Sequence, residues 1–194
     1  MAADNFLWFP DPASGGLLTS GADKPQGEST DDWFSKKGAV ELASFGFGVA
    51  QADTSGSGTS GASAGKAKFE EFTIEKDVDQ ASAPLFGACT AGAHFPNIVL
   101  IVRKPGGSNL LYVQFIFRQV FVTGVNWSGA GGEENLKESI KFKFGAMGIQ
   151  YIAQTAKGAA DSRIMQGWWS TVTNQPNSEV TGLSGPPDFM PGTQ

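Results

Sequence analysis

The sequence predicts a mainly β fold: a small antiparallel β-barrel or sandwich with one short flanking α-helix and a long N-terminal loop. Runs rich in Phe, Ile, Val and Thr recur along the 194 residues, and these residue types favour a pleated, half-buried surface. Turn residues separate the runs at intervals of about 8–12 residues, as in sandwiches and barrels. A single stretch, between residues 79 and 92, has the residue types that begin and end a helix.

The predicted helix lies between Asp79 and Gly92. Asp79 and Ser82 offer side-chain oxygens for an N-cap, Pro84 suits the first turn, and Gly92 can end the helix in the left-handed conformation. Cys89 falls on the apolar side of this helix, where we expect a buried and unreactive thiol. It is the one cysteine of the chain, which excludes an intramolecular disulfide.

About seven or eight strands are expected from the apolar runs. They fall within residues 6–9, 40–51, 66–76, 98–104, 109–126, 136–144 with an extension to 151, and 163–173. A shift in the apolar phase at Glu70 and Glu71 predicts a bulge. In the long strand one face is expected to carry Leu111, Val113, Phe115, Phe117 and Phe121, and the other face mixes Tyr112, Gln114, Ile116 and Arg118. Either both faces are largely covered, or one covers the core and the other meets a partner.

The alternation is clearest in residues 136–144. The apolar side of this strand is interrupted only by Glu138 and consists of Leu136, Ile140, Phe142 and Phe144. The other side carries Lys137, Ser139, Lys141 and Lys143, which predicts a half-buried strand with a cationic outer face. That face is either a solvated strand surface or a surface for an acidic partner, such as Glu133 and Glu134 of a neighbouring copy.

Three segments read as connections or tails. Residues 11–37 form a long loop in which Trp33 and Phe34 are the bulky residues, and they either face a partner or fold back onto the domain. Residues 52–65 are a Gly/Ser-rich tract, expected to join two strands as a flexible hairpin connection. Residues 175–194 are rich in Pro and Gly and are expected to be disordered, which leaves residues 1–174 as a single domain.

Composition and motifs argue against several functions. A net charge of -5 gives no basic field for nucleic acid or for an anionic membrane, and no apolar run is long enough for a transmembrane helix. The N-terminus lacks the pattern of a signal peptide. His94 is the one histidine, and with Cys89 alone it forms neither a catalytic triad nor a zinc site. We therefore expect no catalytic residue, metal or cofactor; a hydrolase that depends on His94 is the least favoured alternative.

Five segments, in order along the chain, resemble the hemolysin-coregulated protein (Hcp) family, the tube subunits of bacterial type VI secretion systems. They are QGES at 26–29, IEKDVDQASAPLFGAC at 74–89, HFPNIVLIVRKPGG at 94–107, GGEENLKESIKFKFGAMGIQYIAQTAKG at 131–158 and GWWSTVTN at 167–174. The chain departs from the family pattern in the length of residues 11–25, in the tail after residue 174, and at Ala93, where many relatives have a lysine.

The resemblance implies a structural, non-catalytic subunit that forms hexameric rings, and these stack head to tail into a hollow tube. The tube would be built in the bacterial cytoplasm inside a contractile sheath on a baseplate, capped by a spike protein, and expelled without a signal peptide, with effector proteins in its lumen. A non-polymerising effector chaperone or regulator of the same fold is the alternative, because of the insertion and the tail.

Candidate residues can be assigned to each role. The family's ring-stacking loop corresponds to residues 26–37, with Gly27, Glu28, Ser29, Trp33, Phe34, Lys36 and Lys37 as candidates. Candidates for the contact between subunits are Glu133, Glu134, Lys137, Lys141 and Lys143. Candidates for contact with the lumen or with an effector are Gly129, Ala130, Gly131 and Gly132.

Overall fold

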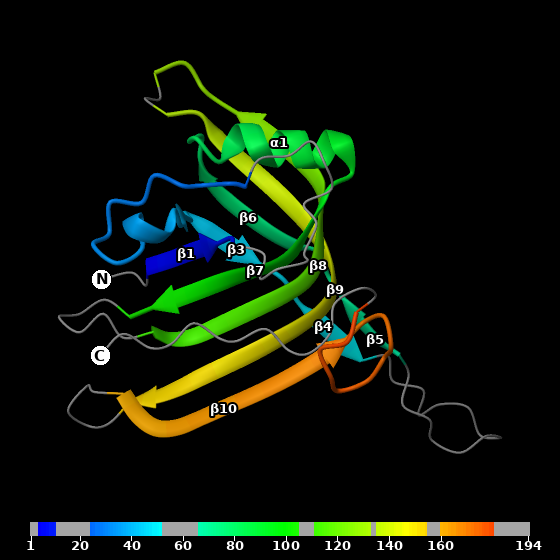
Figure 1. The fold of residues 1–194 in the computed structure, drawn as a ribbon. Coiled ribbons are helices and arrows are strands. Elements are labelled where there is room, and N and C mark those ends of the chain that lie inside the picture. The colour runs from blue at the N-terminus through cyan, green and yellow to red at the C-terminus, as the bar shows by residue number, and fades with distance from the viewer. Residues whose placement is uncertain are drawn as a thin grey trace.

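A computed structural model shows a strongly curled antiparallel sheet with one helix lying across its upper end (Figure 1). It describes residues 4–10, 24–51, 66–104, 111–132, 135–154 and 160–180. The elements in chain order are β1 (Asp4–Trp8), the 3-10 helix η1 (Ser35–Lys37), β2 (Val40–Glu41), β3 (Ser44–Gly46), β4 (Val49–Gln51), β5 (Ala67–Phe69), β6 (Phe72–Asp77), α1 (Ser82–Ala91), β7 (His94–Arg103), β8 (Leu111–Ser128), β9 (Lys137–Gln154) and β10 (Ala160–Ser170).

The two 18-residue strands β8 and β9 form the centre of the sheet. The strand order is β2-β1-β7-β8-β9-β6-β3, and β10 also pairs with β9. The first half of β9 pairs with β6, where Phe142 lies opposite Phe72, and its second half pairs with β10, where Tyr151 lies opposite Met165. The prediction of a mainly β, antiparallel fold with one short helix is therefore confirmed.

The sheet curls without a ladder that closes it into a barrel in the part of the chain that the structure describes. Its path begins at β2 and ends at β3, two strands separated by only Leu42 and Ala43. The Leu42 N–H donates to the Asn5 carbonyl (3.0 Å), and the Ala43 N–H donates to the Glu75 carbonyl (2.8 Å). Two backbone hydrogen bonds thus join the β1 and β6 sides of the sheet where a closed barrel would have a ladder.

A separate two-stranded ribbon, β4–β5, leaves the main sheet and projects from one side of the molecule (Figure 1). All three residues of β4 are exposed, including Val49 at 61%. Val49 therefore does not join Phe45 and Phe47, which pack against the inner core. The chain passes from the ribbon into β6 at residues 70–71, where the sequence predicted an irregularity.

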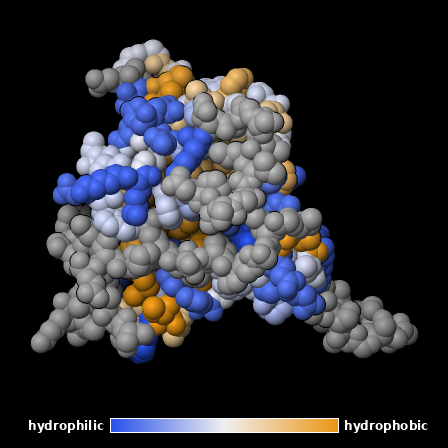
Figure 2. All heavy atoms as spheres, viewed as in Figure 1, coloured by the Kyte–Doolittle hydropathy of each residue, from blue (hydrophilic) through white to orange (hydrophobic). Residues whose placement is uncertain are grey.

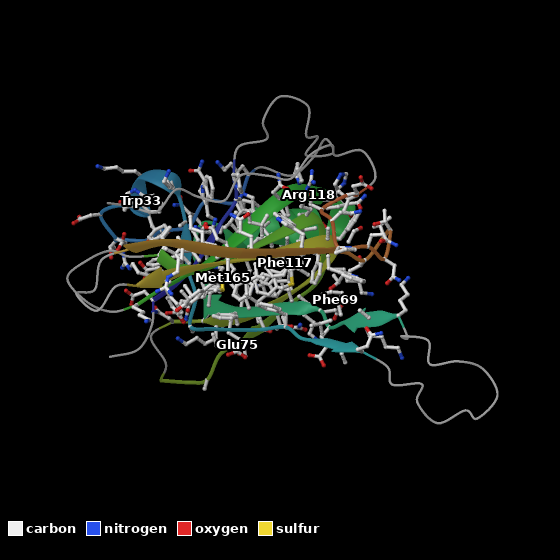
Figure 3. All side chains as sticks on the ribbon, turned by 90° about the horizontal axis from the view of Figure 1, so that it is seen from below. Trp33, Phe69, Glu75, Phe117, Arg118 and Met165 are labelled. Carbon is white, nitrogen blue, oxygen red and sulfur yellow. The ribbon has the colours of Figure 1, made fainter. Side chains whose placement is uncertain are left out.

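Apolar side chains fill both faces of the central strands. Ile98 and Leu100 of β7 point to the inner face that the sheet curls around, and Val99 and Ile101, which alternate with them, point to the outer face. Figure 3 shows the two sides about β10, with Phe117 and Met165 on one side and Arg118 and Trp33 on the other. The inner core contains Leu7, Phe72, Ile74, Leu85, Ile98, Leu100, Phe117, Ile140 and Phe142, and the outer cluster contains Phe6, Phe34, Ala39, Val99, Ile101, Leu111 and Ile116.

The core-facing positions of β8 change parity part-way along the strand. Phe117 lies in the inner core, and so does Val120, whereas Phe121 is 38% exposed. Gln119 lies between them with φ +50°, a left-handed conformation that interrupts the alternation of the pleat. The prediction that Phe121 lies on the same face of the strand as Phe117 is therefore wrong. The register with β9 is unchanged at Gln119 and shifts at a bulge at Thr123.

Helix α1 ends as predicted but begins without the expected cap. Gly92 has φ +62° and terminates the helix in the left-handed conformation. The N-cap residue is Ala81, and neither Asp79 nor Ser82 caps the helix through its side chain. Asp79 instead accepts a hydrogen bond from the Ala81 N–H (2.9 Å), in the turn before the helix. Leu85 of α1 is buried against the inner core.

The chain after β10 turns back across the end of the sheet as far as Val180. The Ser170 Oγ donates to the Glu179 carbonyl (2.5 Å), and an Arg118 guanidinium N–H donates to the Ser178 carbonyl (2.7 Å). Ser178 and Val180 are buried. Ser178 and Val180 are thus packed, within the segment for which the sequence suggested disorder. Residues 181–194 lie outside the described part of the chain.

Candidate assembly surfaces

The loop that precedes β2 packs onto the outer face of the sheet. Phe34 is 1% exposed and stacks on Phe6, with ring centroids 4.1 Å apart. Trp33 packs edge-on against Phe34 (4.6 Å), and the Lys37 ammonium lies 4.9 Å from the Trp33 ring and 5.5 Å from the Trp8 ring. The alternative that these aromatic residues fold back onto the domain is therefore the one observed. Phe34 belongs to the core.

The Gly27–Ser29 segment joins this loop to the rest of the fold. A Gln80 side-chain N–H donates to the Gly27 carbonyl (3.0 Å), and the Gln80 backbone N–H donates to Glu28 (3.2 Å). The Ser29 Oγ donates to Glu41 (2.7 Å). A Cβ at Gly27 would lie 2.3 Å from a backbone carbonyl oxygen, so glycine is needed for this close approach. Each of the three residues therefore contacts this same chain.

Arg103 of β7 holds the loop through two carboxylates. Its guanidinium lies 2.6 Å from Asp31 Oδ2 and 2.9 Å from Asp4 Oδ2. Burial raises the pKa of Asp31, but hydrogen bonds from Arg103 and from the N–H groups of Trp33 and Phe34 outweigh burial, so the pKa is lowered. The Asp31 carboxylate thus fixes the start of η1 while it remains charged.

The predicted cationic stripe is exposed along the outer side of β9. Lys137, Lys141 and Lys143 all reach solvent. Lys137 forms an ion pair with Asp77, and the hydrogen bond that it donates lowers the pKa of that carboxyl group. Lys143 lies 3.8 Å from Glu71. Carboxylates of the same chain therefore accompany two of the three lysines. Residues 133 and 134, their suggested partners, lie outside the described part of the chain.

A buried ionic cluster lies beneath the end of the sheet that carries α1. The Lys76 ammonium, 1% exposed, lies 2.6 Å from Glu138 and 2.5 Å from Asp79. Ser82 donates to Glu138 Oε1 (2.6 Å), and the Trp127 indole N–H donates to Glu138 Oε2 (2.9 Å). Glu138, the one polar residue in the apolar row of its strand, is thus buried because a lysine, a hydroxyl and an indole satisfy it.

A group of exposed apolar side chains lies directly above this cluster, and we call it the hairpin-end patch. It consists of Val78, Phe86, Trp127 and Leu136, which are between 41% and 48% exposed. The Phe86 and Trp127 rings lie 5.8 Å apart, and the Val78 N–H donates to the Leu136 carbonyl (2.9 Å). Apolar surface is visible at this upper end in Figure 2. The candidate residues Gly129, Ala130, Gly131 and Gly132 form the exposed turn beside it.

A second group lies at the other end of β9 and is called the inner-face patch. It consists of Ile149, Tyr151 and Met165, which are 40%, 39% and 66% exposed. Tyr151 lies opposite Val113 of β8 and Met165 of β10, so these three form one row across the sheet. Val113 packs against the inner core. This patch therefore lies on the inner face of the sheet and extends past the buried residues of the inner core.

Cys89 and His94, the two residues with potential reactivity, lie against apolar or aromatic neighbours. Cys89 is half-buried against the inner core, and His94 begins β7 with its ring 5.3 Å from Phe121. Among the described residues, no group of three or more His, Cys, Asp or Glu side chains could hold a metal ion. Nor is any helix in that part of the chain long and apolar enough to span a membrane.

Comparisons with known proteins agree on one family. Residues 17–151 match the model of the family "Type VI secretion system effector, Hcp". The chain is 31% identical over 110 residues to protein hcp1 of Pseudomonas aeruginosa, an alignment that covers 56% of this chain and 68% of the relative.

Solved structures lead to the same result. One described as a type six secretion system protein is 30% identical with a TM-score of 0.75, covering 90% of this chain and 99% of the other. Hcp1 from Salmonella typhimurium is 25% identical with a TM-score of 0.66, covering 91% of this chain and 99% of the other. The chain therefore belongs to the Hcp family of type VI secretion proteins.

Proposed function

We propose that this chain is a structural, non-catalytic tube subunit of a bacterial type VI secretion system. Copies of it would form hexameric rings, and the rings would stack into the hollow tube that the system expels. Assembly would take place in the cytoplasm, against the contractile sheath and baseplate and beneath the spike protein. Export would then follow through the system itself, with effector proteins carried in the lumen.

The observation that carries this proposal is the inner-face patch on an open sheet. Ile149, Tyr151 and Met165 continue the apolar core side beyond its cover. Among the described residues, β10 forms a ladder with β9 alone, and its other edge has a single bridge, between Ser170 and Gln175. An uncovered apolar face next to a strand edge is a surface that proteins normally protect or use for association. Association with further copies would cover it and would build a ring.

We assign the contacts between rings to the β4–β5 ribbon in preference to the buried residues of the 26–37 loop. Phe34 already packs inside its own subunit, whereas the ribbon projects and exposes Val49. Lys36, exposed on η1, and the half-buried Trp33 remain candidates for a stacking contact on the loop surface. Lys141 and Lys143 remain candidates for contact between subunits, and the exposed 129–132 turn for contact with the lumen.

Light scattering coupled to size-exclusion chromatography, followed by electron microscopy, tests the proposal. We expect a species of six times the 20.4 kDa chain mass, and ring-shaped particles that stack end to end at higher protein concentration. A monomer of uniform mass over the whole micromolar range would contradict the proposal. Rings that never stack would favour the effector chaperone or regulator instead.

A further inference from the structure

We infer that the hairpin-end patch of one copy packs against the inner-face patch of the next copy. The inference rests on the proposed self-association, and it names the two surfaces that meet. Neither surface includes the lysine stripe or the 26–37 loop, from which the sequence suggested the contacts. The contact joins two different surfaces of the same chain, and so it is heterologous.

The exposed apolar residues are concentrated in these two places. Eleven large hydrophobic side chains are well exposed among the described residues, and seven of them belong to the two patches. Single exposed apolar residues are normal on a protein surface, whereas a contiguous group marks an interaction site. Two such groups on one chain therefore indicate either two separate interaction sites or one interface in which the two groups meet.

The hairpin-end patch is held rigidly by the buried ionic cluster. The Trp127 indole donates to Glu138, which is itself paired with Lys76. The Phe86 ring lies against Trp127 from α1, and the backbone hydrogen bond between Val78 and Leu136 fixes the other half of the patch. A surface whose side chains are already ordered loses less conformational entropy when it binds. The hairpin-end patch is therefore preorganised for association.

The inner-face patch is an exposed extension of the inner core. It lies on the side around which the sheet curls, next to Val113 and Phe115, which are half-buried against the inner core. The hairpin-end patch stands on a helix and a β-hairpin that project from the upper end of the sheet (Figure 1). The two patches therefore lie at opposite ends of β9, so one copy can use both of them at once.

The positions of the two patches favour another copy of this chain as the partner. Both are carried by the long strands: Trp127 ends β8, while Ile149 and Tyr151 lie in the distal half of β9. Each copy thus presents one patch at each end of the same rigid sheet. A contact between opposite ends leaves one patch of each kind free, so it repeats from copy to copy until it closes into a ring.

A mixing experiment with two charged variants tests this pairing. Leu136→Asp places a charge in the hairpin-end patch, and Met165→Asp places one in the inner-face patch; both positions are exposed, so we expect both variants to fold. Val172→Asp is the matched control, because Val172 is 51% exposed and belongs to neither patch. Circular dichroism checks folding, and sedimentation velocity measures association.

We expect each patch variant alone to remain monomeric at concentrations at which the wild type and Val172→Asp assemble. An equimolar mixture of the two patch variants should give a heterodimer and nothing larger, because each contributes one intact patch. Full assembly of either variant alone, or a mixture of folded variants that stays monomeric, would overturn the inference while the proposed function stands. Failure of the wild type to assemble would contradict both this inference and the proposed function.

Discussion

Replacement of Lys76 by methionine should destabilise the subunit more than the loss of any exposed ion pair. The Lys76 ammonium is 1% exposed, lies 2.6 Å from Glu138, and also donates to Asp79 and Ser82. Removal of one partner from a buried pair leaves the other charge without compensation, at a cost of about 3–5 kcal/mol. For a chain of this size, each kcal/mol lowers the melting temperature by roughly 2–4 °C.

Urea unfolding of Lys76→Met, followed by far-UV circular dichroism, measures this cost. All variants are compared at one protein concentration, because association adds to the apparent stability. The control is Lys137→Met, which breaks an ion pair whose side chains are about half exposed and should cost less than about 1 kcal/mol. The double variant Lys76→Met/Glu138→Leu should recover much of the loss, since the fully buried Glu138 charge is removed together with its partner, while Asp79, 15% exposed, keeps the hydrogen bond from the Ala81 N–H.

Equal costs for Lys76→Met and Lys137→Met would refute the reasoning. Such a result would mean that water reaches the Lys76 site, and that the cluster does not hold β6, β9 and the start of α1 together. A double variant no more stable than Lys76→Met alone would likewise show that the uncompensated Glu138 charge is not the source of the loss.

Two further predictions concern the 26–37 loop. Phe34→Ala should lower the free energy of unfolding by about 3–5 kcal/mol, because it empties a fully buried site; a loss of ring stacking with unchanged urea stability would contradict this. Asp31→Asn should lower stability at pH 7, because the lowered pKa of Asp31 means that its charged form stabilises the fold. The stabilisation by the Asp31 charge is complete above the ordinary pKa of 3.8 and is lost as the pH falls through the lower pKa of the folded state. The melting temperatures of wild type and Asp31→Asn should therefore converge below pH 3.8. The exposed Asp32→Asn is the control.

The fold class could be predicted from local sequence patterns, and the structure confirms these patterns. The alternation of apolar residues about Ile140 and Phe142 marked a half-buried strand, and Gly92 marked the end of the helix. These signals concern neighbours in the chain, so a single sequence contains them. The parity of β8 could not be predicted in the same way, since it depends on the left-handed conformation of Gln119, a residue type without a strong preference for it.

Long-range partners explain the rest of what was missed. Glu138 was recognised as an interruption in an apolar row, but its partner Lys76 lies 62 positions earlier and had to be brought beside it by the pairing of β6 with β9. Phe34 gave no signal that distinguished burial from exposure until the fold placed Phe6 beneath it. The two patches likewise combine residues from separate elements, so only the folded chain brings them together.

The β4–β5 ribbon is also the place where this chain can be lengthened at least cost. Its two strands pair with each other and not with the eight-stranded sheet, and the residues that join them lie between Gln51 and Ala67. A longer connection raises the entropy cost of loop closure by only about 0.6 kcal/mol for each doubling of its length. An epitope tag or a reactive cysteine inserted between these strands should therefore leave the main sheet intact, and it would label each subunit between β4 and β5.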